Sequence, residues 1–381
     1  MKVTFIINDL SGGGAEKALK LLSGYLGIEG VEAHVLTLES GNDEYALDEG
    51  IKRRSLRTDS GGSAIARILR LPLQAAQIAR VLREWEADVC VSFLPRSNIA
   101  HVMTRWFGNR RPVLITEQIS SRDNYPSDSV GDRLMRSLIR RFYPRADAVF
   151  PSSEGVMNGL KEFGVPAERM HVVHNPISIR DIRASAREPV PDFGPPGMPT
   201  IITVGRHAEQ KDHATLLRAF ALVQRRIEAR LVFLGQGPLR VELEALAREL
   251  RIEDSVVFAG WQSNPFAWIA RADLFVLSSR YEGFGNVIVE AMACGLPIVS
   301  TDCPSGPSEI LEGGGAGLLV PVGNVDAIAR AICSVLEEPE TRERLIRESL
   351  RRAPDFDLSV IGPRYAKLLY SFSGRRAAAH V

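Results

Sequence analysis

The chain has 381 residues, of which 45% are hydrophobic and 24% are charged, and its formal net charge is +1. This composition is ordinary for a globular protein, and the length predicts two domains of about 100–200 residues each. A net charge this close to zero excludes the strongly basic balance that is typical of nucleic-acid-binding proteins.

The first predicted element is a buried strand at residues 3–8, a short run that is rich in β-branched residues. The run stops at Asn8 and Asp9, and no small-residue cleavage site follows, so we interpret it as a strand and not as a signal peptide. No stretch reaches the ~18–20 apolar residues that are needed to span a bilayer. The four cysteines form no C-x-x-C pair, which fits a reducing compartment. We therefore expect a cytoplasmic protein.

Strands and helices alternate through the remainder of the first half. A glycine turn at residues 12–14 leads into an amphipathic helix, and further buried strands are predicted at 33–38, 88–94, 112–117 and 146–153. This alternation is typical of a parallel sheet with helices on both faces. Residues 184–199 then hold five prolines and two glycines without periodicity, which indicates a linker.

The second half repeats the pattern from residue 200 onward. Buried strands are predicted at 200–206, 229–237, 255–261, 272–279, 297–302 and 317–321. We therefore expect an α/β protein of two Rossmann-like, doubly wound parallel-sheet domains facing across a cleft, where the ligands of such sheets bind. The predicted boundaries are 1–180 for the N-terminal domain, 181–199 for the linker, 200–357 for the C-terminal domain, and 358–381 for a helix that returns to the first domain, followed by a tail.

The segment 280–294, RYEGFGNVIVEAMAC, carries the strongest functional pattern. Its predicted helix is apolar nearly all round, and its two polar side chains, Asn286 and Glu290, share one face because they are four residues apart. A buried helix with a single polar stripe is expected to face a ligand. The alternative is that Glu282 caps the turn and Glu290 meets solvent at a frayed edge, which would leave a charge unpaired in an apolar helix.

The turn before this helix predicts a site for a phosphorylated sugar. The backbone amides of Phe284, Gly285 and Asn286 have no partners within the helix and lie at its positive end, where an anion binds. The carboxylates of Glu282 and Glu290 flank the turn, and each of them can accept hydrogen bonds from sugar hydroxyls.

Three further turns follow strand ends. Arg206 and Lys211 come after one strand, where two fixed cations would hold a diphosphate and stabilise its charge as it leaves; the alternative is that both are simply solvated. The glycines of SGGGAEK let the backbone approach a ligand, although the third glycine of the dinucleotide-binding pattern is missing. Gly306, in TDCPSGPSEIL, either approaches the same ligand or forms a plain turn.

Together these segments resemble the large family of retaining glycosyltransferases known as family 4 or group 1, which has the GT-B fold. The specific motif is the pair Glu282 and Glu290, spaced as E-x7-E between ADLFVLSS and GLPIVSTD. The resemblance covers nearly the whole second domain and the first turn of the first domain. It implies that the first domain is the acceptor side and the second the side of the nucleotide-sugar donor.

The resemblance also implies a role for each matching residue. Glu282 would contact the donor sugar and Glu290 the ribose of the nucleotide. Arg206 and Lys211 match the pair that binds the diphosphate, while Gly13 and Gly14 match the glycine loop of the family.

One position departs from the family. Many members carry a histidine at the end of a strand in the first domain, close to the transferred sugar, and here Glu117 stands at that place. Glu117, Arg122 and Asn124 are therefore weak candidates for acceptor or donor contacts. His101 is another weak candidate, although a lone histidine on a helix is more often structural.

The mechanism that the resemblance implies uses no metal ion and no cofactor, because cations and helix amides already neutralise the leaving diphosphate. The leaving phosphate takes the acceptor proton on the same face, which retains the configuration. A double displacement would need a placed nucleophilic carboxylate, and we identify none. The one D-x-D pattern, at 355–357, lies in a proline-flanked stretch that we expect at the surface.

Two basic, amphipathic stretches lie in the first domain, at 63–85 and 132–145. Such stretches either lie on anionic lipid surfaces or form solvated helix faces, and both interpretations stay open here. A peripheral position on the inner face of the cytoplasmic membrane would suit a lipid-linked acceptor.

We therefore expect a hexosyltransferase that moves a hexose or N-acetylhexosamine from a nucleotide-diphosphate sugar to a glycan or lipid-linked acceptor. The acceptor would belong to cell-envelope polysaccharide, such as lipopolysaccharide, or to another glycoconjugate. The resemblance favours a UDP-sugar, and GDP-mannose stays open. The alternatives are a nucleotide-sugar epimerase on the same fold, a nicotinamide oxidoreductase, which the missing third glycine disfavours, and a non-catalytic carbohydrate-binding protein.

Overall fold

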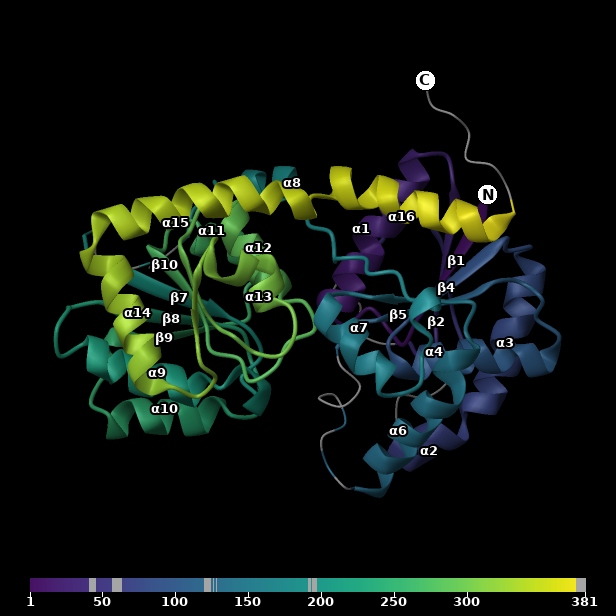
Figure 1. Ribbon diagram of the computed structural model, residues 1–381, viewed down its shortest axis with the longest axis horizontal. Helices are drawn as coiled ribbons and strands as arrows, with labels where there is room; N and C mark the ends of the chain where they lie inside the picture. Colours follow the sequence, from purple (N-terminus) through teal and green to yellow (C-terminus); the bar gives the residue numbers. More distant parts are fainter. Residues whose placement is uncertain are drawn as a thin grey trace. The chain divides into compact units, whose positions relative to one another are not determined.

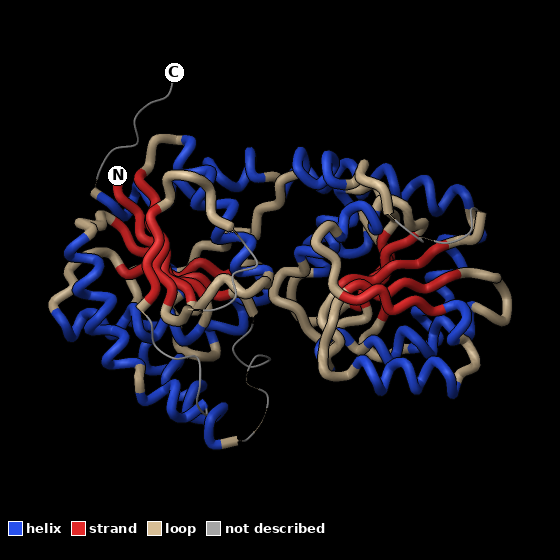
Figure 2. The backbone as a smooth tube through the Cα atoms, turned by 180° about the vertical axis from the view of Figure 1, so that it is seen from behind, coloured by secondary structure: helices blue, strands red, loops and turns tan. Residues whose placement is uncertain are grey.

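The computed structural model describes residues 1–40, 46–56, 64–119, 125, 127, 129–190, 193 and 197–374. The chain divides into two compact units, one formed by Met1–Pro176 with Leu358–Val381 and the other by Ile177–Asp357. Each unit is a parallel sheet with helices on both faces (Figure 1, Figure 2).

The sheet of the first unit has six parallel strands in the order β3-β2-β1-β4-β5-β6. The strands are β1 Lys2–Ile7, β2 Glu32–Thr37, β3 Lys52–Ser55, β4 Val89–Phe93, β5 Val113–Glu117 and β6 Ala148–Pro151. Strand β1 shows why the buried runs are apolar throughout. Phe5 and Ile7 pack into the core on one face, Ile6 packs into the core on the other, and so both faces of the strand need apolar side chains.

Helices cover the two faces of this sheet. The helices of this unit are α1 Gly14–Ile28, α2 Ala64–Leu69, α3 Leu71–Glu84, α4 Pro95–Met103, α6 Val130–Phe142, α7 Glu154–Lys161 and α16 Leu358–Ser373. Helices α1 and α16 supply one core, and α3, α4, α6 and α7 supply the other. Helix α16 approaches α1 closely because Gly362 has no side chain: a Cβ atom there would lie 2.8 Å from the ring of Tyr25.

The sheet of the second unit has the order β12-β11-β10-β7-β8-β9. Its strands are β7 Thr200–Val204, β8 Arg230–Leu234, β9 Val256–Gly260, β10 Leu274–Leu277, β11 Ile298–Thr301 and β12 Leu318–Val320. Its helices are α8 Ile179–Ser185, α9 His213–Val223, α10 Arg240–Glu249, α11 Pro265–Ile269, α12 Asn286–Ala293, α13 Pro307–Ile310, α14 Val325–Glu337 and α15 Pro339–Arg352. Helices α9, α10 and α14 supply one core, and α8, α11, α12 and α13 supply the other.

The segment expected as a linker, 181–199, overlaps helix α8, which begins at Ile179 and belongs to the second unit. Ile182 of α8 is 2% exposed and packs in the same core as α12, so this part of the segment is folded onto the sheet. The second unit begins at Ile177 and ends at Asp357. These two residues pair with each other as an isolated parallel bridge.

Both sheets have the same topology, because each builds its second and third strands on one side of its first strand and its fourth to sixth on the other. The direction of winding reverses between the first and fourth strands, which are β1 and β4 in one unit and β7 and β10 in the other. Ligands of doubly wound sheets bind at the carboxyl ends of these two strands. The fold thus points to the loops after β1, β4, β7 and β10.

Candidate functional site

The loops after β7 and β10 bring two residues of the predicted donor site into contact. Lys211 lies in the loop after β7 and Glu282 in the loop after β10, and the Nζ atom of Lys211 donates to Oε1 of Glu282 at 2.6 Å. The hydroxyl of Ser279 donates to the same carboxylate oxygen, also at 2.6 Å. The side chains of Lys211 and Glu282 are only 13% and 7% exposed, so this is a largely desolvated ion pair.

Two hydrogen bonds to backbone carbonyls fix the loops to each other. The hydroxyl of Ser278 donates to the carbonyl of Lys211 at 2.7 Å, and the amide of Arg280 donates to the carbonyl of Gln210 at 2.8 Å. Gly205 leaves space for the stem of Lys211, since a Cβ atom there would lie 3.0 Å from Cε of the lysine. The loops therefore hold the lysine in one place.

Arg206, the other predicted cation, has a different environment. Its side chain is exposed, and among the described residues its guanidinium has no ion-pair partner. Arg206 thus adds an exposed cation to the same loop that carries Lys211, and a guanidinium suits a diphosphate.

The glycine turn before α12 is built by close backbone packing. Gly285 has a φ of 99° and Gly306 a φ of 87°, which is the left-handed region that favours glycine. A Cβ atom at Gly306 would lie 1.9 Å from the carbonyl oxygen of Phe284, so the Gly306 turn packs directly against the Phe284 turn. The side chain of Phe284 is 2% exposed and meets Phe356 edge to face, which leaves only its backbone for a ligand.

The two polar residues of helix α12 differ in their exposure to solvent. Asn286 begins the helix and is half-buried, while Glu290 is 5% exposed. The alternative that Glu290 meets solvent at a frayed edge is therefore wrong. Five of the other six residues of the helix are buried and form core contacts, in agreement with the apolar pattern.

The glycine loop of the first unit follows β1. Gly12 has a φ of 86°, Gly13 precedes α1 in an extended conformation, and Gly14 is the first residue of the helix. A Cβ atom at Gly13 would lie 2.5 Å from a carboxylate oxygen of Glu16, so a larger residue would displace that side chain. The loop lies at the carboxyl end of β1, which is where the topology predicts a ligand.

Two of the weak candidates of the first unit, Glu117 and His101, lie among the described residues, and both are buried. Glu117 is the last residue of β5, is 1% exposed, and accepts a hydrogen bond from the hydroxyl of Tyr143 at 2.5 Å; burial raises the pKa of its carboxyl to about 7. Asn98 in turn donates to the Tyr143 oxygen at 3.0 Å. This network makes Glu117 an interior group of the first unit and not a surface carboxylate.

His101 lies in the core of the first unit, which argues against a contact with the acceptor. Its side chain is fully buried, its Nδ1 atom lies 3.1 Å from the hydroxyl of Ser92, and burial lowers the pKa of its imidazole to about 3. It is a neutral core histidine between α4 and β4. Arg122 and Asn124 lie outside the described residues.

The described part of the chain contains no group of three His, Cys, Asp or Glu side chains that could hold a metal ion. Within the D-x-D pattern, Asp355 pairs with Arg352 at 2.6 Å and Asp357 accepts from the backbone amide of Ile179 at 3.0 Å. Both aspartates therefore stabilise the local structure through these contacts. That the protein works without a metal ion stays a prediction.

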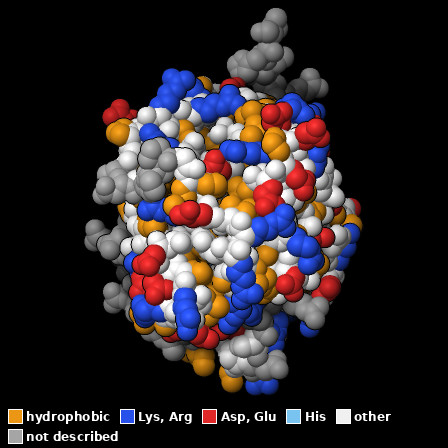
Figure 3. All heavy atoms as spheres, turned by 90° about the vertical axis from the view of Figure 1, so that its left-hand side faces the viewer, with side chains coloured by type: hydrophobic (Ala, Val, Ile, Leu, Met, Phe, Trp, Pro, Cys, Tyr) orange, Lys and Arg blue, Asp and Glu red, His pale blue; other side chains and the backbone are white. Residues whose placement is uncertain are grey.

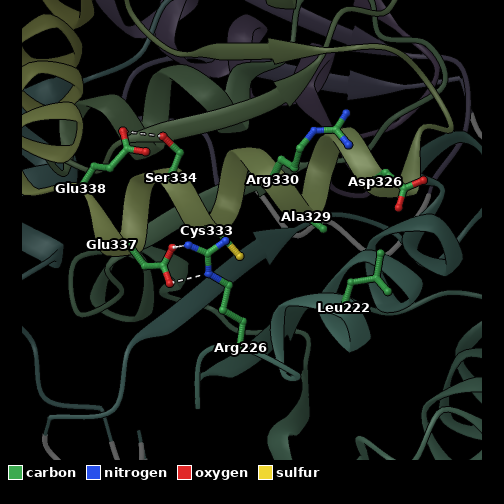
Figure 4. A pocket seen from close by; sticks show the side chains of 9 residues that line it. All are labelled: Leu222, Arg226, Asp326, Ala329, Arg330, Cys333, Ser334, Glu337 and Glu338. Atoms are coloured by element: carbon green, nitrogen blue, oxygen red, sulfur yellow. Dashed lines mark hydrogen bonds and ion pairs between the residues drawn. The ribbon is translucent and has the colours of Figure 1, made fainter.

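A cavity of about 300 Å³ lies away from these residues, between α9 and α14 (Figure 4). Arg226 and Glu337 form an ion pair at 2.6 Å beside it, and Cys333 is among its lining residues. None of the predicted site residues lines this cavity.

Two family models match the chain. The model described as "Glycosyl transferases group 1" matches residues 191–352, and the one described as "Glycosyl transferase 4-like domain" matches residues 13–176. A similar curated protein is the N-acetylgalactosamine-N,N'-diacetylbacillosaminyl-diphospho-undecaprenol 4-alpha-N-acetylgalactosaminyltransferase of Campylobacter jejuni. It is 30% identical over 362 residues, which cover 93% of this chain and 96% of the relative. The lipopolysaccharide core biosynthesis glycosyltransferase LpsE of Rhizobium meliloti is 29% identical, with 94% and 96% covered.

Solved structures share the fold. The sucrose-phosphate synthase of Thermosynechococcus elongatus superposes with a TM-score of 0.83 at 21% identity, covering 98% of this chain and 99% of the other. Anabaena HepE in complex with UDP-glucose superposes with a TM-score of 0.80 at 22% identity, covering 97% and 100%. The two parallel sheets with their flanking helices are thus those of a GT-B fold.

Proposed function

The chain belongs to the group 1 glycosyltransferases, and from this premise we propose that it transfers a hexose or N-acetylhexosamine, with retention of configuration, from a UDP-sugar to a lipid-linked or glycan acceptor. The observation that carries the proposal is the contact between Lys211 and Glu282 at the carboxyl ends of β7 and β10. The contact supports the proposal because an ammonium, which can bind a diphosphate, and a carboxylate, which can bind sugar hydroxyls, lie side by side where a doubly wound sheet binds its ligand.

The site can stabilise the leaving group by electrostatics. A lysine ammonium has three donor hydrogens, so Lys211 can keep its bond to Glu282 and still donate to a phosphate oxygen. Arg206 and the amides at the start of α12 add further donors for the charge that develops on the diphosphate. In our proposal Glu282 binds a hydroxyl of the donor sugar and Glu290 binds the ribose.

The proposed transfer needs no nucleophile from the protein, because the acceptor oxygen itself attacks the donor sugar. The bond between the anomeric carbon and the diphosphate oxygen breaks as the acceptor oxygen forms its bond to that carbon on the same face. The acceptor proton passes to the departing phosphate oxygen. The role of the protein is to position both substrates and to stabilise the negative charge.

Names of relatives support the donor and acceptor classes. The Campylobacter jejuni relative is named as an N-acetylgalactosaminyltransferase for a diphospho-undecaprenol-linked sugar, and the Rhizobium meliloti relative is named for lipopolysaccharide core biosynthesis. We extend these classes to the present chain as an envelope-glycan function, and we propose a cytoplasmic enzyme.

A peripheral contact with the membrane is the second part of the proposal. No described helix is long and apolar enough to span a bilayer. On α2 and α3, Leu69 is 73% and Leu73 is 60% exposed, and Arg133, Arg140 and Arg141 of the neighbouring helix α6 are exposed as well. Exposed apolar side chains beside cations suit an anionic lipid surface. The face of the molecule in Figure 3 instead carries acidic and basic side chains intermingled.

The test is a transfer assay with UDP-linked hexoses, UDP-linked N-acetylhexosamines and GDP-mannose, each offered with a polyprenyl-diphosphate-linked N-acetylhexosamine as acceptor. We expect product only with an acceptor present, with one UDP-sugar preferred and with the anomeric configuration of the donor retained by NMR. Inverted product would contradict the retaining mechanism. Conversion of the donor sugar without an acceptor would favour the epimerase instead.

A further inference from the structure

Two buried histidines lie next to the loop that carries both predicted phosphate-binding cations. His207 follows Arg206 directly, and His213 comes two residues after Lys211. Their Nδ1 atoms are 3.1 Å apart, and the side chains are 0% and 3% exposed. The two imidazoles therefore join the beginning of this loop to its end through a buried hydrogen bond.

Aromatic rings surround the histidine pair. Phe233 lies 5.0 Å from the His213 ring, and Phe258 lies 5.9 Å from the His207 ring, with the two phenyl rings stacked at 4.9 Å. Burial lowers the pKa of His213 to about 3, and the nearby His207 and Lys211 add to the effect. Burial lowers the pKa of His207 as well, and Arg240 acts in the same direction, whereas a hydrogen bond with the backbone of Gly235 and the charge of Glu244 act against it. The pair is neutral at physiological pH.

A neutral pair at this distance requires complementary tautomers. One Nδ1 atom must carry a proton and the other must offer its lone pair, because two lone pairs or two protons would repel each other at 3.1 Å. A protein interior that fixes two tautomers also fixes the orientation of both rings.

The backbone of His207 is fixed independently of its ring. Its amide donates to the carbonyl of Gln236 at 3.0 Å, and its carbonyl accepts from the amide of Leu239 at 3.1 Å. Gly237 packs against this peptide so closely that a Cβ atom there would lie 2.4 Å from the carbonyl oxygen of His207. The peptide of His207 is therefore fixed in place, and the hydrogen bond to His213 links it to the first residue of α9 at the far end of the loop.

We propose that the hydrogen-bonded pair His207–His213 is a positioning element that holds Arg206 and Lys211 at the spacing needed to bind a diphosphate. The proposal rests on the proposed function, because it concerns the same donor site. Neither histidine is expected to touch the substrate. They act on the two cations indirectly, because their hydrogen bond joins the two ends of the loop between them.

The test uses inorganic pyrophosphate, UDP and uridine as probes of the 381-residue chain and of its variants His213→Phe and His213→Asn. Phenylalanine keeps the ring but removes the hydrogen bond, whereas the asparagine side chain can replace Nδ1 in that bond. We expect His213→Phe to bind pyrophosphate and UDP about tenfold more weakly, which is the upper range for one neutral hydrogen bond, while uridine binding is unchanged. His213→Asn should restore affinity to within about threefold of wild type.

Hydrogen exchange of residues 205–213 supplies a second readout that does not depend on activity. We expect faster exchange in His213→Phe than in wild type and near-normal exchange in His213→Asn. If both variants bind pyrophosphate as wild type does and exchange at the same rate, the positioning role is refuted while the donor site stands. If wild type itself binds neither pyrophosphate nor UDP, the donor site fails and the positioning role fails with it.

Discussion

The ammonium of Lys211 and the carboxylate of Glu282 lie 2.6 Å apart, although 71 positions separate them in the sequence. The pair connects the two loops of the second unit that follow β7 and β10. Each residue is more than four-fifths buried, so the loss of either one leaves its partner as a buried charge.

Replacing Lys211 by glutamine should lower both activity and stability. We expect kcat to fall about 10²- to 10³-fold, because one preorganised donor to the developing charge is lost. The free energy of unfolding should fall by about 3 kcal/mol, since Glu282 keeps its charge in a desolvated position. Activity assays and urea unfolding measure the two effects.

Two variants separate these effects. Lys367→Gln, at an exposed lysine of α16, is the matched control and should change neither quantity. In Lys211→Gln/Glu282→Gln, the stability should recover because no charge is left unpaired, while the activity should stay low. Recovery of activity in the double variant would show that the lysine acts only on stability.

Gly306→Ala should destabilise the second unit strongly. The new methyl group would lie 1.9 Å from the carbonyl oxygen of Phe284, in a backbone conformation with a φ of 87°. We expect a loss of about 3 kcal/mol or more in the free energy of unfolding. Gly313→Ala is the matched control, because Gly313 also has a positive φ but open space around it, and it should cost only about 1 kcal/mol. Equal losses would refute the close-packed turn.

The stability of the first unit should decrease as the pH rises from about 4.5 to about 7. In the folded state Glu117 keeps its proton to a pKa of about 7, whereas its ordinary value is 4.5. The folded chain thus binds more protons in this window, so the free energy of unfolding falls with pH, by up to about 3 kcal/mol. Unfolding of Glu117→Gln, followed over the same pH range, should lack this slope.

A second variant, Tyr143→Phe, tests the cause of the raised pKa of Glu117. The Tyr143 hydroxyl stabilises the carboxylate of Glu117 and so lowers its pKa against the effect of burial. In Tyr143→Phe, the pH range over which the stability decreases should therefore extend to higher pH. A shift to lower pH would contradict the hydrogen bond as the structure has it.

Membrane contact should depend on the exposed leucines of α2 and α3. With vesicles that contain anionic phospholipid, we expect Leu69→Glu/Leu73→Glu to bind about tenfold more weakly than wild type, because two apolar contacts are lost and two negative charges are added. Val241→Glu, at a residue of the second unit that is 70% exposed, is the control. Equal vesicle binding by all three proteins would remove the support for a lipid-facing surface at α2 and α3.

Much of the fold could be predicted from the sequence. Strands such as β1 and β10 lie in short apolar runs because both of their faces are covered, and their observed bounds differ from the predicted ones by a few residues at most. Strand β3 escaped prediction for the opposite reason. It is an edge strand with the sequence KRRS, whose side chains are mostly exposed, and so it carries no apolar pattern.

The candidate site was predictable only in part. The pattern of segment 280–294 predicted the buried helix and its polar face, because periodicity is a local property. The contacts Lys211–Glu282 and His207–His213 were not predicted, since they depend on how loops pack after the strands are in place. His101 shows the same limit: the sequence placed it on a helix, but only packing shows that its ring faces the core.

The most direct measurement of the donor site is a thermal-unfolding panel with UDP, GDP, ADP and their common sugar conjugates, each with and without EDTA. Wild type, Lys211→Gln and Lys367→Gln are compared, because a ligand that binds only the folded state raises Tm. We expect UDP and its conjugates to raise Tm equally for wild type and Lys367→Gln, regardless of EDTA, and to lose most of this effect on Lys211→Gln. If no nucleotide diphosphate raises Tm, or if Lys211→Gln responds as wild type does, the assignment of the donor site to Lys211 and Glu282 is contradicted.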